Sequence, residues 1–143
     1  MRAIGVSNFL VHHLRDLLDD RPKVAPMVNQ VEFHPRLLQR ELMEFCRSHG
    51  IVQGAWSPLM QGKVFAIPEL QELAEKYERT VAQVVLRWNL QHGVVTIPKS
   101  VRRERVAENA ALFDFELSSD DMARIDTLDR GQRVGSDPDN FKF

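Results

Sequence analysis

A cluster of positive charges in the last third of the sequence is the clearest candidate for chemistry. Lys99, Arg102, Arg103 and Arg105 lie beside Ser100, in a chain whose formal net charge is only −1. The cluster stands where a short apolar strand is expected to end and a helix to begin. Backbone N–H groups and the positive end of the helix dipole point to such a junction. The pattern therefore predicts a local phosphate site, and several cations favour a ligand with an extra phosphate group.

The alternative is an ordinary solvated first helical turn, in which Glu104 and Glu108 partly balance the cations. Positive side chains at a helix N-terminus are unfavourable for the helix itself. A bound anion would offset that cost, which favours the interpretation as a binding site.

Polar or aromatic side chains also follow each predicted strand. They are Ser7 and Asn8; Asn29, Gln30, Glu32 and His34; Trp56 and Ser57; and Lys99 and Ser100. In parallel α/β folds the carboxyl ends of the strands form the rim where ligands bind. Asn8 and Gln30 can donate and accept at once, as a carboxamide ligand requires, and Trp56 offers a flat face for stacking. Each residue alone could instead cap a helix or fill the core, but four strand ends together favour a binding rim.

Four strand–helix units must position this rim, and hydrophobic periodicity predicts them. The expected strands are 2–6, 27–33, 51–56 and 94–97, and the expected helices are 10–19, 37–49, 68–78, 81–92, 102–110 and a last one ending near 128. Gly50 and Gly93 fit the left-handed position after a helix, and Ser118 fits an N-cap. Residues 128–143 are expected to form a loop-like C-terminal tail.

Consecutive βα units imply an α/β fold with parallel strands joined by right-handed crossovers. Two architectures fit this pattern: an open doubly wound sheet, and part of a (β/α)8 barrel. A complete barrel takes roughly 250 residues, so 143 residues would form about half of one, as a single domain over 1–143. Half a barrel would leave two strand edges unpaired and its inner face uncovered, so we expect it to be unstable alone.

The composition of the chain limits its possible partners and its location in the cell. With 43% hydrophobic and 27% charged residues, the chain is typical of a soluble globular protein. Its near-neutral charge argues against nucleic acid or a membrane as partner. The N-terminus lacks the ordered parts of a signal peptide, so we expect a cytoplasmic protein. The single cysteine, Cys46, excludes an internal disulfide and is expected to be a small buried hydrophobe.

The motifs resemble those of one known family across essentially the whole chain. The residues that carry the resemblance are I-G-V-S-N-F at 4–9, N-Q-V-E-F-H-P at 29–35, A-W-S-P-L at 55–59, and I-P-K-S followed by Arg105, Glu108 and Asn109. Together they resemble the aldo-keto reductases, and the tail at 133–141 is similar to the bacterial glyoxal and diketogluconate reductase branch. The resemblance implies half of a (β/α)8 barrel and hydride transfer from NADPH to aldehydes and ketones.

The resemblance also implies a role for each site residue. It places Ser7, Asn8 and Gln30 on the nicotinamide carboxamide, Trp56 on the nicotinamide ring, Ser57 and Leu59 along the pyrophosphate, Lys99, Ser100 and Arg105 on the adenosine 2′-phosphate, and Glu108 and Asn109 near the adenine. Most members have tyrosine where Trp56 stands. Arg102 and Arg103 replace residues that are usually uncharged or proline, which would reinforce a preference for NADPH.

The family's catalytic Asp, Tyr, Lys and His come from the first half of its barrel, to which this sequence does not correspond. The only tyrosine, Tyr77, lies in an expected helix, and we interpret His34 as structural. The histidines show no metal-binding spacing, so no metal is expected. We therefore predict no catalytic residue in this chain and no activity of the chain alone.

Three functional hypotheses remain at this point. The first is the C-terminal, NADPH-binding part of a reductase for small aldehydes or ketones, completed by an N-terminal half. The second is a non-catalytic nucleotide-binding or scaffold protein that self-associates through exposed half-barrel edges. The third is an anion or nucleic-acid binder that uses residues 99–105, which the near-neutral charge disfavours.

Overall fold

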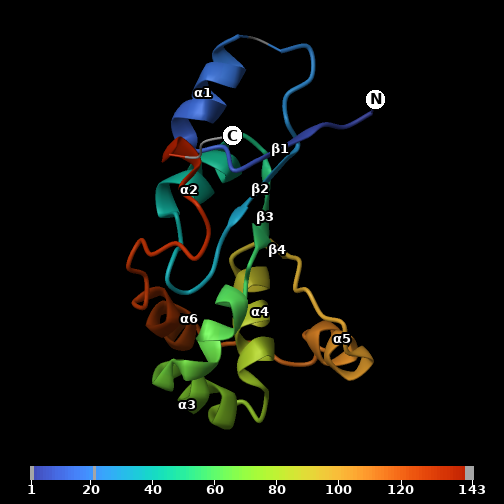
Figure 1. The fold of residues 1–143 in the computed structure, drawn as a ribbon, viewed down its shortest axis with the longest axis vertical. Coiled ribbons are helices and arrows are strands. Elements are labelled where there is room, and N and C mark those ends of the chain that lie inside the picture. Colours follow the sequence, from blue (N-terminus) through green and yellow to red (C-terminus); the bar gives the residue numbers. More distant parts are fainter. Residues whose placement is uncertain (1, 21, 141–143) are drawn as a thin grey trace.

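The computed structural model describes residues 2–20 and 22–140, and Figure 1 shows how their helices and strands are arranged. The elements in chain order are β1 (Gly5–Ser7), α1 (Val11–Asp19), β2 (Val28–Glu32), α2 (Arg40–Ser48), β3 (Val52–Trp56), the 3-10 segment η1 (Met60–Ala66), α3 (Pro68–Lys76), α4 (Val81–Gln91), β4 (Val95–Thr96), α5 (Arg103–Ala110), α6 (Ser119–Asp126) and the short 3-10 turn η2 (Pro138–Asn140).

All four strands are parallel and lie in chain order, β1-β2-β3-β4. The register pairs Val28 of β2 with Gly5 of β1 on one side and with Val52 of β3 on the other. Each strand is followed by at least one helix, so the structure consists of four βα units as predicted. Because the strands are parallel, their carboxyl ends lie at the same edge of the sheet.

Two apolar clusters join the sheet to its helices. The larger one includes Phe33 after β2 and Trp88 of α4, whose rings stack with centroids 5.0 Å apart. The smaller one comprises Leu14, Val31, Leu42, Cys46 and Ile51. Cys46 is buried there as a free thiol, which confirms its predicted place in the core.

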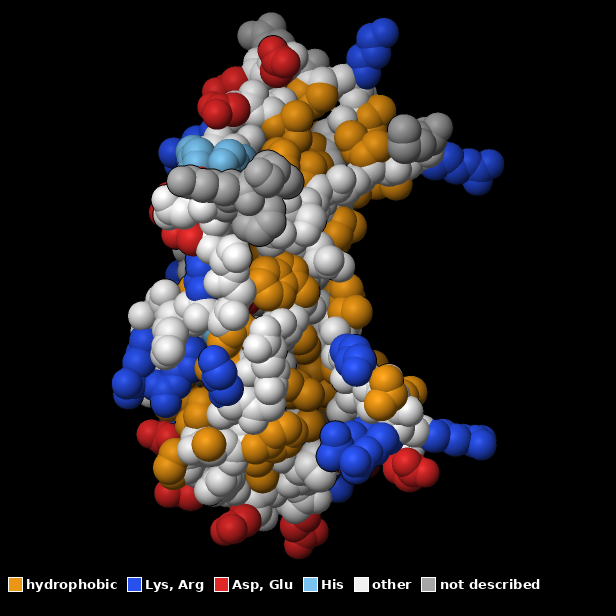
Figure 2. Space-filling view, in the orientation of Figure 1, with side chains coloured by type: hydrophobic (Ala, Val, Ile, Leu, Met, Phe, Trp, Pro, Cys, Tyr) orange, Lys and Arg blue, Asp and Glu red, His pale blue; other side chains and the backbone are white. Residues whose placement is uncertain are grey.

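The other face of the sheet is partly open. Val28, Val52, Val95 and Ile97 are between 40% and 51% exposed. Alternation along the strands places Val28 and Val52 on the face opposite to the helices. Figure 2 shows hydrophobic side chains along this hollowed side of the molecule. The exposed valines agree with the expectation of an uncovered inner face.

Several element boundaries differ from the predicted ones. The helix expected at 37–49 begins at Arg40, because His34 and Leu37 form a bridge and Gln39 has a left-handed φ of 47°. The first strand, expected at 2–6, begins only at Gly5 and extends to Ser7. Gly50 and Gly93 have the predicted positive φ, 66° and 75°.

The helix start at Ser118 is confirmed, since its side chain accepts a hydrogen bond from the backbone N–H of Asp121. Over residues 2–20 and 22–140, no helix combines the length and the apolar character needed to span a bilayer.

Candidate functional site

A pocket of about 670 Å³ lies beside η1 and the segment from β4 to α5. Seven of the predicted site residues line it: Ser57, Leu59, Lys99, Ser100, Arg105, Glu108 and Asn109. The structure therefore brings together residues that are separated by up to 52 positions in the sequence.

The positive charge of this pocket is not balanced by ion pairs. Lys99, Arg102 and Arg105 line the pocket, whereas Arg103 is not among its lining residues. None of the ion pairs found within residues 2–20 and 22–140 involves these four cations. Free cations at the start of a helix favour a bound anion. The pocket therefore fits a phosphate group.

Local hydrogen bonds shape the two ends of the basic segment. The Ser100 hydroxyl accepts a bond of 3.2 Å from the backbone N–H of Arg102, the residue that precedes α5. Toward the other end of this segment, the Thr80 hydroxyl donates to Glu108 Oε1 over 2.6 Å, and both residues line the pocket. Glu108 is thus oriented by the residue that caps α4, and among the described residues its carboxylate forms no ion pair with Lys99 or Arg105.

A second pocket, of about 460 Å³, lies on the same rim above β1 and β3. Its lining residues are Ser7, Asn8, Phe9, His13, Trp56, Ser136 and Pro138. The Trp56 indole donates to Asn8 Oδ1 over 2.8 Å, so the ring orientation is fixed. Three predicted site residues meet here.

Gln30 is the one predicted site residue that lines neither pocket. Its backbone carbonyl accepts hydrogen bonds from the Ser7 hydroxyl, at 3.0 Å, and from the backbone N–H of Asn8, at 2.9 Å. Gln30 therefore positions the start of the loop that carries Ser7 and Asn8.

The chain turns sharply where two of the strands reach the rim. Asn8, directly after β1, and Ser57, directly after β3, have positive φ values of 59° and 50°. Non-glycine residues rarely adopt this conformation, and such positions concentrate at functional sites. The turns place both side chains at the rim and direct the following backbone away from the sheet.

Glu32 stands among the polar residues that the sequence places at the rim, but the sequence assigned it no role. Its carboxylate is fully buried and accepts hydrogen bonds from the backbone N–H groups of Val134, at 2.6 Å, and Gly135, at 3.3 Å. His34 Nε2 lies 2.8 Å from the same carboxylate. Burial lowers the pKa of His34, although the hydrogen bond and the charge of Glu32 act to raise it. Glu32 thus anchors the C-terminal tail across the rim, a contact that no local sequence spacing could indicate.

Tyr77 lines neither pocket, as predicted, but it caps the end of α3 (Pro68–Lys76) instead of lying within the expected helix. It follows α3, and its hydroxyl donates to Asp121 of α6, which Lys76 also contacts at 2.6 Å. Burial alone would raise the pKa of Asp121, but hydrogen bonds from Lys76, Tyr77 and Ser118 lower it to about 2. This cluster holds two helices together.

The family model of the aldo/keto reductase family matches residues 1–130. Together with the parallel βα units and the rim pockets, this match shows that the chain belongs to the aldo/keto reductase family. Its fold corresponds to about half of the aldo-keto reductase barrel.

Two relatives from Bacillus subtilis (strain 168) are similar over the full chain. Glyoxal reductase is 59% identical over 143 residues, and the uncharacterized oxidoreductase YtbE is 57% identical. The chain covers 51% of the length of each. The crystal structure of a Gox0644 point mutant in complex with NADPH superposes with a TM-score of 0.93 and 46% identity, covering 99% of this chain and 52% of that one. The chain therefore spans about half the length of the relatives it matches.

Proposed function

We propose that this chain is the NADPH-binding part of an aldo-keto reductase that reduces small aldehydes or ketones to alcohols. The observation that carries the proposal is the basic pocket with Lys99, Arg105 and Ser100 on the same rim as the pocket at Trp56. The NADPH complex of Gox0644 and the similarity to a glyoxal reductase support the cofactor and the substrate class. The buried free thiol of Cys46 suits the reducing cytoplasm as its location.

The spacing of the two pockets suits an extended dinucleotide. Neighbouring strands are about 4.8 Å apart, so β1 and β4 are separated by roughly 14 Å at the rim. In our proposal the nicotinamide lies against Trp56, with its carboxamide near Ser7, Asn8 and Gln30. The pyrophosphate then passes Ser57 and Leu59.

The adenosine end of the cofactor then lies in the basic pocket. Lys99, Ser100 and Arg105 would bind the 2′-phosphate, while Glu108 and Asn109 would lie near the adenine. Arg102, which also lines this pocket, would add to the attraction. Bound NADPH would supply the hydride, and the residues of this chain would orient the ring and neutralise the phosphate charge.

A fluorescence titration with NADPH and NADH tests the cofactor assignment. Arg105→Ala should weaken NADPH binding about 10- to 100-fold, since a charge-assisted hydrogen bond contributes about 1.5–3 kcal/mol. NADH binding should change little because NADH lacks the 2′-phosphate. Arg103→Ala is the matched control: the resemblance implied that Arg103 reinforces the preference for NADPH, but Arg103 does not line the pocket. Equal losses for both cofactors would contradict the 2′-phosphate assignment.

Reduction also requires a proton at the carbonyl oxygen. Tyr77, the only tyrosine of the sequence, is bound to Asp121 and is not among the lining residues of either rim pocket. We therefore expect the 143-residue chain to show no reduction of methylglyoxal by itself. Turnover by the pure chain would contradict this part of the proposal, whereas activity that appears on adding an N-terminal half of the family would support it.

A second candidate is a non-catalytic nucleotide-binding scaffold that self-associates. The exposed side chains of Val28, Val52 and Val95, together with the edge strands β1 and β4, favour this alternative. Gel filtration at several concentrations distinguishes it. A stable dimer with no activity after complementation would favour the scaffold, while a monomer completed by a second half would favour the reductase.

A further inference from the structure

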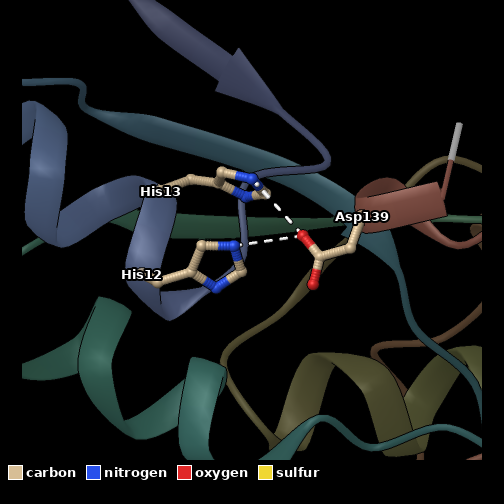
Figure 3. Close-up of side chains that lie close together, drawn as sticks. All are labelled: His12, His13 and Asp139. Carbon is tan, nitrogen blue, oxygen red and sulfur yellow. Dashed lines mark ion pairs between the residues drawn. The ribbon is translucent and has the colours of Figure 1, made fainter.

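Two adjacent histidines of α1 meet the C-terminal tail at one carboxylate. His12 Nε2 lies 3.0 Å and His13 Nε2 lies 3.4 Å from the same oxygen, Oδ1 of Asp139 in η2. Figure 3 shows both imidazoles directed at this atom. The two segments are far apart in the sequence, so their meeting is a feature of the fold.

This contact lies at the wall of the pocket above Trp56. His13 lines that pocket directly, and the tail contributes Ser136 and Pro138. The tail is therefore held at two places: at the buried carboxylate of Glu32 near Val134, and at Asp139 by the histidines. The part of the pocket wall between these two contacts, which includes Ser136 and Pro138, therefore depends on both contacts.

The position of the proton on His13 distinguishes a direct contact with Asp139 from a metal site. The three ligand atoms lie within 4.8 Å of one another, which would suit a metal ion. However, His13 Nδ1 accepts a hydrogen bond from the backbone N–H of Leu10 at 3.1 Å. Nδ1 must therefore be unprotonated, and the proton of the neutral ring is on Nε2, facing Asp139. A metal at Nε2 would require the opposite tautomer and the loss of the Leu10 bond.

We propose that His12 and His13 form an ion-pair latch for Asp139, which holds the tail over the pocket at Trp56. The effect of the latch on binding rests on the proposed function. If the chain binds NADPH as proposed, the latch tightens the binding of the nicotinamide half. The three latch residues act as positioning residues, because they fix the tail that forms the pocket wall. The adenosine half binds in the other pocket and does not depend on the latch.

The test compares NADPH with adenosine 2′,5′-bisphosphate, which carries only the adenosine half. Asp139→Ala leaves α1 and its cap intact. It should weaken NADPH binding about two- to fivefold, the range expected for exposed ion-pair contacts. Binding of the bisphosphate should be unchanged, and the backbone amides of residues 136–140 should exchange faster. Asp16→Ala, which removes an exposed carboxylate from the same helix, is the matched control and should alter none of these values.

Two further variants separate the latch from a metal site. His12→Gln with His13→Gln keeps an N–H donor near each Nε2 position and should retain slow amide exchange in the tail. His12→Ala with His13→Ala should lose it. Measurements with EDTA and with added Zn²⁺ complete the comparison. Tail protection that requires Zn²⁺, and that the glutamine variant loses, would overturn the latch.

The two proposals fail in different ways. If the wild-type chain binds neither NADPH nor the bisphosphate, the proposed function fails, while amide exchange still tests the latch. If both ligands bind but Asp139→Ala changes neither tail exchange nor NADPH affinity, the latch is wrong. An equal loss of affinity for both ligands would also overturn it.

Discussion

Trp56 donates its indole N–H to Asn8 Oδ1 over 2.8 Å, and this bond connects the ends of two strands that are not neighbours. Trp56 ends β3 and Asn8 follows β1, with β2 between them. The bond therefore passes over β2 and fixes the indole plane relative to the loop after β1. A stacking surface whose orientation is already set loses less entropy when a ring binds to it.

Removing the Trp56–Asn8 bond should weaken NADPH binding without abolishing it. Trp56→Phe keeps an aromatic face but loses the N–H, and we expect a loss of about two- to tenfold, as for one net hydrogen bond. Asn8→Gly removes the acceptor and tolerates the φ of 59° at this position. The two changes should be non-additive in NADPH titrations. Fully additive losses would show that the two side chains act separately.

Gly135 should tolerate no side chain. A Cβ at this position would overlap Cη2 of Trp56 and would lie 3.0 Å from Cζ3. Gly135→Ala must therefore displace either the tail or the indole. We expect a shifted emission of Trp56, faster proteolysis of the tail and a lower affinity for NADPH. Gly131→Ala is a useful comparison, since open space surrounds that position and only its φ of 60° is strained. Unchanged emission and proteolysis in Gly135→Ala would contradict the close contact.

The sequence was sufficient to predict the four βα units and the basic segment that lines the larger pocket, because both depend on local patterns. Hydrophobic periodicity locates the strands and helices, and Lys99 to Asn109 forms one continuous segment. The anchoring of the tail could not be predicted in this way. Glu32 and Val134 are 102 positions apart, and nothing in the residues around either one indicates the other.

The Asp121 cluster should make stability depend on pH at the acid end. The pKa of Asp121 is about 2 in the folded chain, below its ordinary value of 3.8. The carboxylate therefore stabilises the fold above about pH 4, and this contribution is lost as the pH falls toward 2. Asp121→Asn should destabilise the chain by about 1–3 kcal/mol at neutral pH, since it removes a buried charged acceptor.

Denaturant unfolding at several pH values checks this expectation. The loss of stability between about pH 4 and about pH 2 should be smaller in Asp121→Asn than in the wild type. Asp120→Asn provides a control on the same helix, because Asp120 is exposed. A parallel pH profile for wild type and Asp121→Asn would exclude Asp121 as the source.

Cys46 should react slowly with thiol reagents in the folded chain. It is only 1% exposed, and burial raises the pKa of its thiol, which lowers the fraction of reactive thiolate. Labelling with a disulfide reagent should be at least about a hundredfold slower in the native chain than in denaturant. Rapid labelling under native conditions would show that the cluster around Leu14 and Val31 opens readily.

The order of the strands has a consequence for how the chain is made. Since each strand of β1-β2-β3-β4 pairs with the one before it, every βα unit can dock as soon as it leaves the ribosome. The tail differs, because its partner Glu32 was synthesised 102 residues earlier. Contacts of such long separation form late. The wall over Trp56 therefore forms after the four strands have paired.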